Sequence, residues 1–251
     1  MNLRKVIPVR LKDYLKLLIR SKAPSANSWS SAQEWELGNS IAYMSNEGFQ
    51  KQLQETNSKD HRASKGWADP TELVEFFSDD KDIWKSFISD ITDKVVMEIG
   101  PCLIAKIAHW DVASRRIAIE PLFSQISQYQ DATFGMNGFP GVEAYAMPAE
   151  KLLPEFIGLV DGALLVRNCI DHSPYWAFIL GNIAQYIAPG GQLLIWNDLL
   201  HPDSYRDGHY DICDDKELFR NLIVSLGFKI ISEWESPTSV CLNYGCRAVK
   251  V

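Results

Sequence analysis

The sequence predicts an α/β fold, with a doubly wound, mostly parallel sheet of seven strands in residues 93–251 and a helical extension in residues 1–92. After Asp93, short β-branched runs alternate with segments of helix length, which is typical of βαβ units and of a parallel sheet covered on both faces. Two strand-like runs follow each other at the end of the chain, which predicts an antiparallel pair at one edge. The expected strands are Val95–Ile99, Arg116–Ile119, Val142–Ala146, Gly162–Val166, Gln192–Trp196, Lys229–Trp234 and Val240–Val249.

The segments between these strands have the length and pattern of helices. The C-terminal helix is expected to end at Gly227, because glycine commonly follows the last turn of a helix. In the extension, Ala68–Phe77 carries a helix-start signal, an aspartate followed by a proline and then acidic residues. We expect the extension to form a helical lid over a cleft in the α/β domain. The helices expected after the first strand are Leu103–Trp110, Leu122–Gln130, Ala149–Phe156, Tyr175–Ile187 and Asp214–Leu226.

The first 22 residues differ in charge from the rest of the chain. They hold seven basic residues and one acid, a net +6, so that the remainder carries −13 of the total −7. Leu11, Leu15, Leu18 and Ile19 form one stripe of an expected amphipathic helix. Two interpretations stay open: a helix that caps the body of the protein, which we prefer, and peripheral contact of residues 1–22 with an anionic membrane surface or a partner groove.

The composition argues against several classes of protein. A net charge of −7 disfavours nucleic acid as a partner, because phosphate binding needs a basic face. The five cysteines are odd in number and contain no CxxC pair, so neither a zinc site nor a disulfide framework is expected. No apolar run is long enough to span a membrane, and there is no secretory signal, so we expect a cytoplasmic protein.

The turn after the first strand bears on the cofactor. Gly100 and Pro101 follow the strand directly, and Glu98 lies two positions before the glycine. The second and third glycines of a dinucleotide fingerprint are missing, and the chain has no GxxxxGK[ST] loop for a triphosphate. A cofactor without phosphate groups therefore fits this turn better than a nicotinamide dinucleotide does.

Six segments in order, from Asp93 to Val251, together resemble the class I S-adenosylmethionine-dependent methyltransferases. They are "VVMEIGP", "RIAIEPL", "AMPAEKLLP", "LLVRNCIDH", "IAPGGQLLIWND" and "DKELFRNLIVSLGFKI". The resemblance implies S-adenosylmethionine as the cofactor. It also implies that the first turn passes the methionine part of the cofactor, that Glu120 accepts both ribose hydroxyls, and that the loop near Ala149 borders the adenine. The cofactor-binding residues implied are Glu98, Gly100, Pro101, Glu120, Pro121, Pro148, Ala149, Glu150, Arg167 and Asn168.

Two residues depart from the pattern of that family. Cys102 occupies a position where glycine is more common, and it would crowd the backbone next to the cofactor. Pro148 replaces an acid that binds the adenine amino group in many members, which implies adenine recognition by backbone and packing, with Glu150 nearby.

Methyl transfer to a hydroxyl needs a base beside the acceptor, because the hydroxyl must lose its proton. His172, just after the fourth strand, is the expected base, with Asp171 as its orienting partner; the alternative is that His172 caps the next helix. His209, in a polar stretch after the fifth strand, is the rival candidate. Asp171, Asp198 and His201 could in principle hold Mg²⁺, but the carboxylates are too sparse, so no metal is expected.

The function expected from the sequence is S-adenosylmethionine-dependent O-methylation of a small molecule or a sugar hydroxyl. N- and C-methylation stay open, because the cofactor motifs do not specify the acceptor atom. The alternative is a catalytically weak, methyltransferase-like protein that serves as a binding or scaffold subunit, and Cys102 and Pro148 are the residues that favour it.

Overall fold

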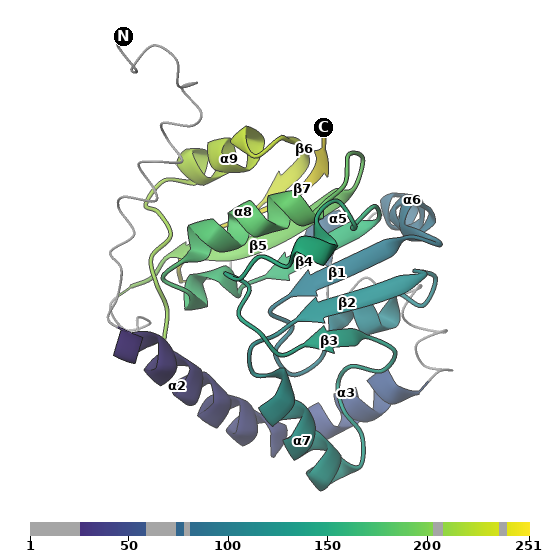
Figure 1. The fold of residues 1–251 in the computed structure, drawn as a ribbon, viewed down its shortest axis with the longest axis vertical. Coiled ribbons are helices and arrows are strands. Elements are labelled where there is room, and N and C mark those ends of the chain that lie inside the picture. Colours follow the sequence, from purple (N-terminus) through teal and green to yellow (C-terminus); the bar gives the residue numbers. More distant parts are fainter. Residues whose placement is uncertain (1–25, 59–73, 78–80, 203–207, 236–239) are drawn as a thin grey trace.

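The structure, a computed structural model, describes residues 26–58, 74–77, 81–202, 208–235 and 240–251 (Figure 1). Its centre is one seven-stranded sheet in the order β3-β2-β1-β4-β5-β7-β6. Strands β1 to β5 run parallel, whereas β7 is antiparallel to both β5 and β6. The doubly wound sheet and its antiparallel edge are thus confirmed. The strands are β1 (Val95–Ile99), β2 (Arg115–Ile119), β3 (Glu143–Tyr145), β4 (Ala163–Arg167), β5 (Gln192–Leu200), β6 (Phe228–Trp234) and β7 (Leu242–Lys250).

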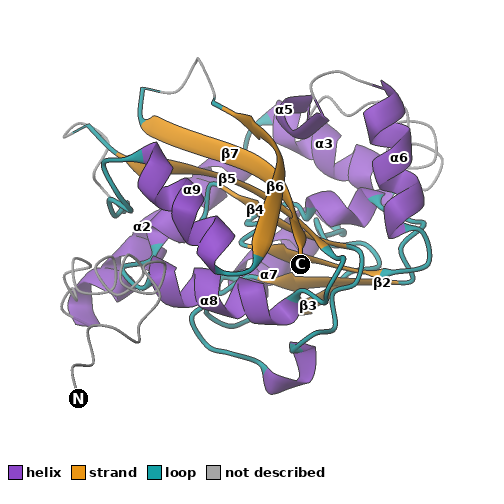
Figure 2. Ribbon diagram, turned by 90° about the horizontal axis from the view of Figure 1, so that it is seen from above, coloured by secondary structure: helices purple, strands orange, loops and turns teal. Residues whose placement is uncertain are grey.

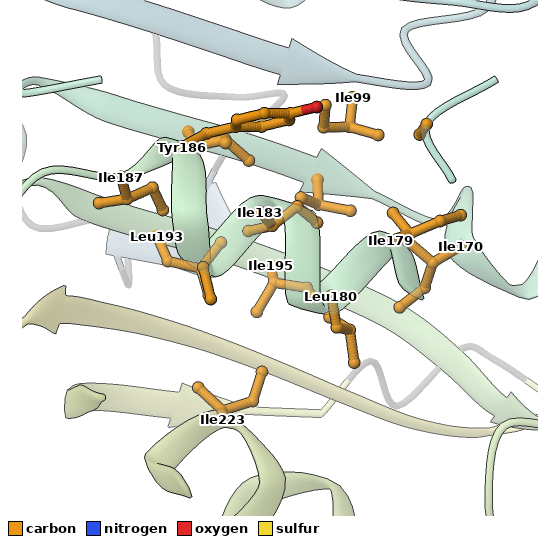
Figure 3. Packing of buried hydrophobic residues seen from close by; sticks show 14 of the residues in the cluster. Ile99, Ile170, Ile179, Leu180, Ile183, Tyr186, Ile187, Leu193, Ile195 and Ile223 are labelled. Carbon is orange, nitrogen blue, oxygen red and sulfur yellow. The ribbon is translucent and has the colours of Figure 1, made fainter. Parts of the chain in front are cut away.

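Helices cover both faces of the sheet. Helices α8 (Trp176–Tyr186) and α9 (Lys216–Ser225) lie on one face, and α5 (Val74–Phe77) and α6 (Lys81–Ile91) lie on the other (Figure 2). Figure 3 shows the first of these layers, in which isoleucine and leucine side chains of α8 pack against strands β1 and β5. Burial of each such side chain stabilises the fold by about 1.5–3 kcal/mol relative to exposure.

Successive residues of the inner strands alternate between the two cores, as the pleat of a strand requires. In β1, Val96 packs in the core under α5 and α6, whereas Met97 packs in the core under α8 and α9. Both side chains are fully buried, which explains why the inner strands are continuous apolar runs rather than alternating ones. A strand of this kind that also contains Glu98 must provide a partner for that carboxylate.

The order of the strands reverses between β1 and β4, since the chain moves from β1 outward to β3 and then returns to the other side of β1. In open α/β sheets the ligand binds at such a point, beyond the carboxyl ends of the strands. Helices α2 (Ala26–Met44) and α7 (Phe123–Phe134) lie close to each other near this edge of the sheet (Figure 1).

Two of the expected helices are wrong. Leu103–Trp110 contains only a 3-10 turn at Lys106–His109. The backbone amide of Ile107 donates to the Glu98 carboxylate, 3.2 Å away, and this hydrogen bond holds the segment against β1. Ala149–Phe156 contains only the turn Pro154–Phe156, because Pro154 lacks the amide that a continuous helix would need there.

The rest of the α/β domain follows the expected pattern. Helices α7, α8 and α9 occur where the sequence predicts them. Strand β5 extends beyond Trp196 to Leu200, since it pairs along its length with β7. The amphipathic segment 1–22 lies outside the described residues, as does most of Ala68–Phe77, of which Val74–Phe77 is helical. The extension also contains α3 (Glu47–Asn57). No helix in the described ranges is both long and apolar enough to cross a membrane.

Candidate functional site

A pocket opens where β1, β2 and β4 end, at the point of strand-order reversal. It encloses about 560 Å³, a volume that includes its mouth, which is open to solvent. Six of the residues predicted from the sequence line it: Gly100, Glu120, Pro121, Ala149, Glu150 and His172. The other lining residues are Gln33, Glu36, Ile99, Ile119, Cys169, Ser173 and Ile179.

Glu120 follows the last residue of β2 and is held there by the backbone. The amide of Cys102 donates to Glu120 Oε2 and the amide of Leu122 donates to Oε1, both at 2.9 Å. The side chain is 4 % exposed, and this burial raises the pKa of Glu120 to about 7 although the two amide hydrogen bonds lower it. A carboxylate oxygen can accept more than one hydrogen bond, so both oxygens of Glu120 can also accept hydroxyl donors from the pocket.

Gly100 turns the chain out of β1 with a φ of +67°, a conformation that side chains rarely adopt. A Cβ atom at this position would lie 2.5 Å from Cys169 Cβ, at the end of the neighbouring strand β4. This turn therefore requires a residue without a side chain. The immediate cause of this requirement is the close approach of the two chain segments that follow β1 and β4.

Glu98 is buried beneath the pocket rather than lining it. Its carboxylate accepts the amide of Ile107, and burial raises the pKa of Glu98 to about 7. An unpaired carboxylate in this core would be costly, so the hydrogen bond fixes the loop that returns from the Gly100 turn. The structure assigns Glu98 a supporting position under the first turn.

Cys102 does not line the pocket. Its backbone has a φ of +56°, its amide binds Glu120, and its sulfur lies 3.5 Å from Ser40 Oγ on α2. The thiol therefore contacts α2. Pro101, Pro148, Arg167 and Asn168 are likewise absent from the pocket lining.

The loop after β3 is attached to helix α8. The side-chain amide of Asn182 donates to the backbone carbonyls of Ala149 and Glu150, both at 2.9 Å. The Ser173 hydroxyl donates to the Glu150 carboxylate. The wall of the pocket that the sequence predicts to border adenine is thus held by three hydrogen bonds, without an acid at position 148.

Asp171, in the 3-10 turn Ile170–His172 after β4, is fully buried. Asn197 donates to its Oδ1 at 2.5 Å, and His201 Nε2 lies 3.2 Å from its Oδ2. Burial alone would raise the pKa of Asp171, but the hydrogen bond from His201 and the nearby imidazoles keep it below the usual value. Asp171 therefore orients His201, not His172 as the sequence suggests.

His172 faces the pocket, with 22 % of its side chain exposed. Its Nδ1 lies 3.8 Å from Glu36 Oε2, and its ring is 4.5 Å from the ring of His209, centroid to centroid. The alternative role of His172 as a helix cap is not observed, because the N-cap of α8 is Tyr175 and no side chain forms a capping hydrogen bond there. His209 in turn lies 4.9 Å from His201, so the three imidazoles form a chain that leads inward from the pocket.

Potential metal ligands meet in two groups within the described residues. Donor atoms of Asp171, His172 and His209 lie within 4.8 Å of one another, and those of Asp198, His201 and Cys241 do the same. The Mg²⁺ set considered from the sequence is divided between these groups, with Asp171 in one and the other two residues in the second.

Glu36 lines the pocket although the sequence did not indicate it. It comes from α2, in the extension. Burial is the main reason that the pKa of Glu36 is raised; the charge of Asp171 raises it further, whereas the charge of His209 lowers it. Gln33, one helical turn earlier, lines the same pocket. Neither residue belongs to a motif, so only the docking of α2 over the strand ends could reveal them.

The comparisons with known proteins concern the fold. No protein-family model and no curated protein sequence matches the chain. Similar solved structures include an S-adenosylmethionine-dependent methyltransferase from Mesorhizobium loti, with 12 % identity, a TM-score of 0.47, and coverage of 66 % of this chain and 97 % of that one. A protein from Pyrococcus horikoshii has 13 % identity and a TM-score of 0.48, covering 78 % and 93 % of the two chains. A 16S rRNA adenine methyltransferase from Catenulisporales acidiphilia has 17 % identity and a TM-score of 0.45, covering 68 % and 91 %.

Proposed function

We propose that this protein is an S-adenosylmethionine-dependent methyltransferase that methylates a hydroxyl of a small molecule or a sugar. The observation that carries the proposal is Glu120: a carboxylate at the end of β2, fixed by two backbone amides and facing a pocket at the strand-order reversal. Two neighbouring oxygens in one plane match the two adjacent hydroxyls of a ribose. The charge-assisted hydrogen bonds that result are among the strongest available to a neutral ligand group.

The composition of the pocket supports this cofactor rather than a phosphorylated one. Glu36, Glu120 and Glu150 line it, and the described lining residues include no lysine or arginine. Negative charge of this kind disfavours the phosphates of a nucleotide and favours a cofactor that carries a sulfonium and an ammonium group. Ile179 offers an apolar contact beside the Ala149 loop, suited to an adenine ring.

The reaction that follows is an in-line displacement. The hydroxyl oxygen forms a bond to the methyl carbon as the bond from that carbon to sulfur breaks, and the electron pair stays on sulfur. His172 is the proposed base for the hydroxyl proton, because it lines the pocket and is partly exposed. Asp171 and His209 lie close to His172. The proposed role of Asp171 is to orient His201, which it contacts in the interior.

Helix α2 is the proposed lid. It supplies Gln33 and Glu36 to the pocket wall, and its Ser40 is buried against Cys102. A lid that closes over the methyl group excludes water from the displacement.

Isothermal titration calorimetry of the full chain tests the cofactor assignment. The expected result is saturable binding of S-adenosylmethionine with a stoichiometry of one, and no binding of NAD or ATP under the same conditions. Binding of NAD or ATP with no binding of S-adenosylmethionine would remove the proposal. Turnover is then tested with methyl-labelled cofactor and a panel of hydroxylated acceptors.

A further inference from the structure

Glu36 lines the pocket together with two residues to which the proposed function gives roles. One is Glu120, expected at the ribose, and the other is His172, expected beside the acceptor. Glu36 Oε2 lies 3.8 Å from His172 Nδ1. The charge of Glu36 raises the pKa of Glu120, and the charge of Asp171 raises the pKa of Glu36. The sulfur of the cofactor connects the ribose to the methyl group, so a cofactor that extends from Glu120 to His172 would bring its sulfur near Glu36.

Within the described ranges, the surroundings of Glu36 hold more negative than positive charge. It is 27 % exposed, and the other carboxylates near it are Glu120 and Asp171. In the part of the chain that the structure describes, the imidazoles of His172 and His209 lie near Glu36 and can carry positive charge. A cation placed in the pocket would therefore relieve the repulsion among these carboxylates, whereas a neutral ligand of the same shape would not.

We propose that Glu36 selects the cofactor by charge, so that the pocket binds the sulfonium of S-adenosylmethionine more tightly than the neutral thioether that remains after methyl transfer. This inference rests on the proposed function. Methyl transfer removes the positive charge from sulfur, because the electron pair of the broken carbon–sulfur bond stays on that atom. The lid carboxylate then loses its partner, which favours opening of α2 and release of the product.

Charge discrimination of this kind has a measurable size. The attraction between two opposite unit charges about 4 Å apart is weak in bulk water and several times stronger at a partly buried protein site. We expect the full chain to bind the cationic ligand on the order of tenfold more tightly than the thioether. The preference should decrease at high ionic strength, since part of the pocket is open to solvent.

The experiment compares three ligands that differ at one position: S-adenosylmethionine, S-adenosylhomocysteine, and sinefungin, an analogue in which a carbon that carries an ammonium group replaces the sulfonium. Their affinities are measured by calorimetry for the parent chain, Glu36→Gln, Glu36→Asp and Glu34→Gln. Glu34 is an exposed glutamate of the same helix and serves as the matched control. Thermal melting without ligand verifies that each variant is folded.

In the parent chain and in Glu34→Gln, both cationic ligands should bind about tenfold more tightly than S-adenosylhomocysteine. Glu36→Gln should reduce that ratio toward one while the affinity for S-adenosylhomocysteine stays within about twofold, and Glu36→Asp should keep part of the preference. A ratio that is unchanged in Glu36→Gln, or an equal loss of affinity for all three ligands, would overturn the inference. If none of the three binds to the parent chain, the proposed function itself fails.

Discussion

Replacement of Glu120 by glutamine tests how the cofactor ribose is bound. Glutamine keeps the size of the side chain and one acceptor oxygen, but its NH₂ group must face either the amide of Cys102 or that of Leu122, both of which donate to Glu120 in the parent. One backbone amide in a nearly buried position then loses its acceptor. We expect a loss of about 1–3 kcal/mol in the free energy of unfolding.

The effect on binding should be larger than the effect on folding. A hydrogen bond to a charged group contributes about 1.5–3 kcal/mol, and Glu120→Gln removes the charge from both ribose contacts. At about 1.4 kcal/mol per factor of ten, the affinity for S-adenosylmethionine should fall at least tenfold. Calorimetry gives the affinity, and urea unfolding without ligand gives the stability.

The control is Glu155→Gln, an exposed glutamate outside the pocket lining, which should change neither quantity. A folded Glu120→Gln variant that binds the cofactor as tightly as the parent would refute the assignment of Glu120 to the ribose.

Three further predictions follow from the same geometry. His172→Ala should lower kcat about 10²- to 10⁴-fold with nearly unchanged cofactor affinity, while His209→Ala mostly raises the acceptor KM; exchanged phenotypes in steady-state kinetics would move the base to His209. Because the pKa of free Glu120 is about 7 and ribose hydroxyls favour its charged form, cofactor binding should release a proton and weaken as pH falls below 7. Calorimetry at pH 6 and 8 measures this, and tighter binding at pH 6 would contradict it. Ile183→Ala, in the core under α8, should cost about 2–5 kcal/mol by urea unfolding, whereas exposed Ile231→Ala should have little effect.

The sheet could be predicted from the sequence because parallel strands that are buried on both faces are nearly continuous apolar runs. β1 is a short apolar run, and the same is true of β4 and β5, since each is covered on both faces. The ends of these elements were less predictable. The extension of β5 to Leu200 depends on pairing with β7, which lies far along the chain.

The two helices that the sequence wrongly predicts both meet tertiary hydrogen bonds, and the second also contains Pro154, which lacks a backbone amide. Their apolar patterns permit a helix, but tertiary hydrogen bonds take the backbone elsewhere. Glu98 binds the amide of Ile107, and Asn182 binds the carbonyls of Ala149 and Glu150. Side chains distant in sequence decide both segments, so local propensity could not identify the outcome.

The cofactor half of the candidate site was more predictable than its acceptor half. Gly100 and Glu120 lie at strand ends, where the topology alone brings them together. The partner of Asp171 proved to be His201, and Glu36 came from a separate helix, because these contacts depend on how a loop and a lid pack over the sheet. Residues of this kind carry no motif.

The measurement that tests the central claim most directly is a crystal structure of the full chain with S-adenosylmethionine. The account predicts both ribose hydroxyls within hydrogen-bond distance, roughly 2.5–3.0 Å, of the two Glu120 oxygens, with the adenine beside Ala149 and the sulfonium facing Glu36. A cofactor whose ribose lies away from Glu120, or a pocket that stays closed to it while the ligand binds elsewhere, would contradict the account.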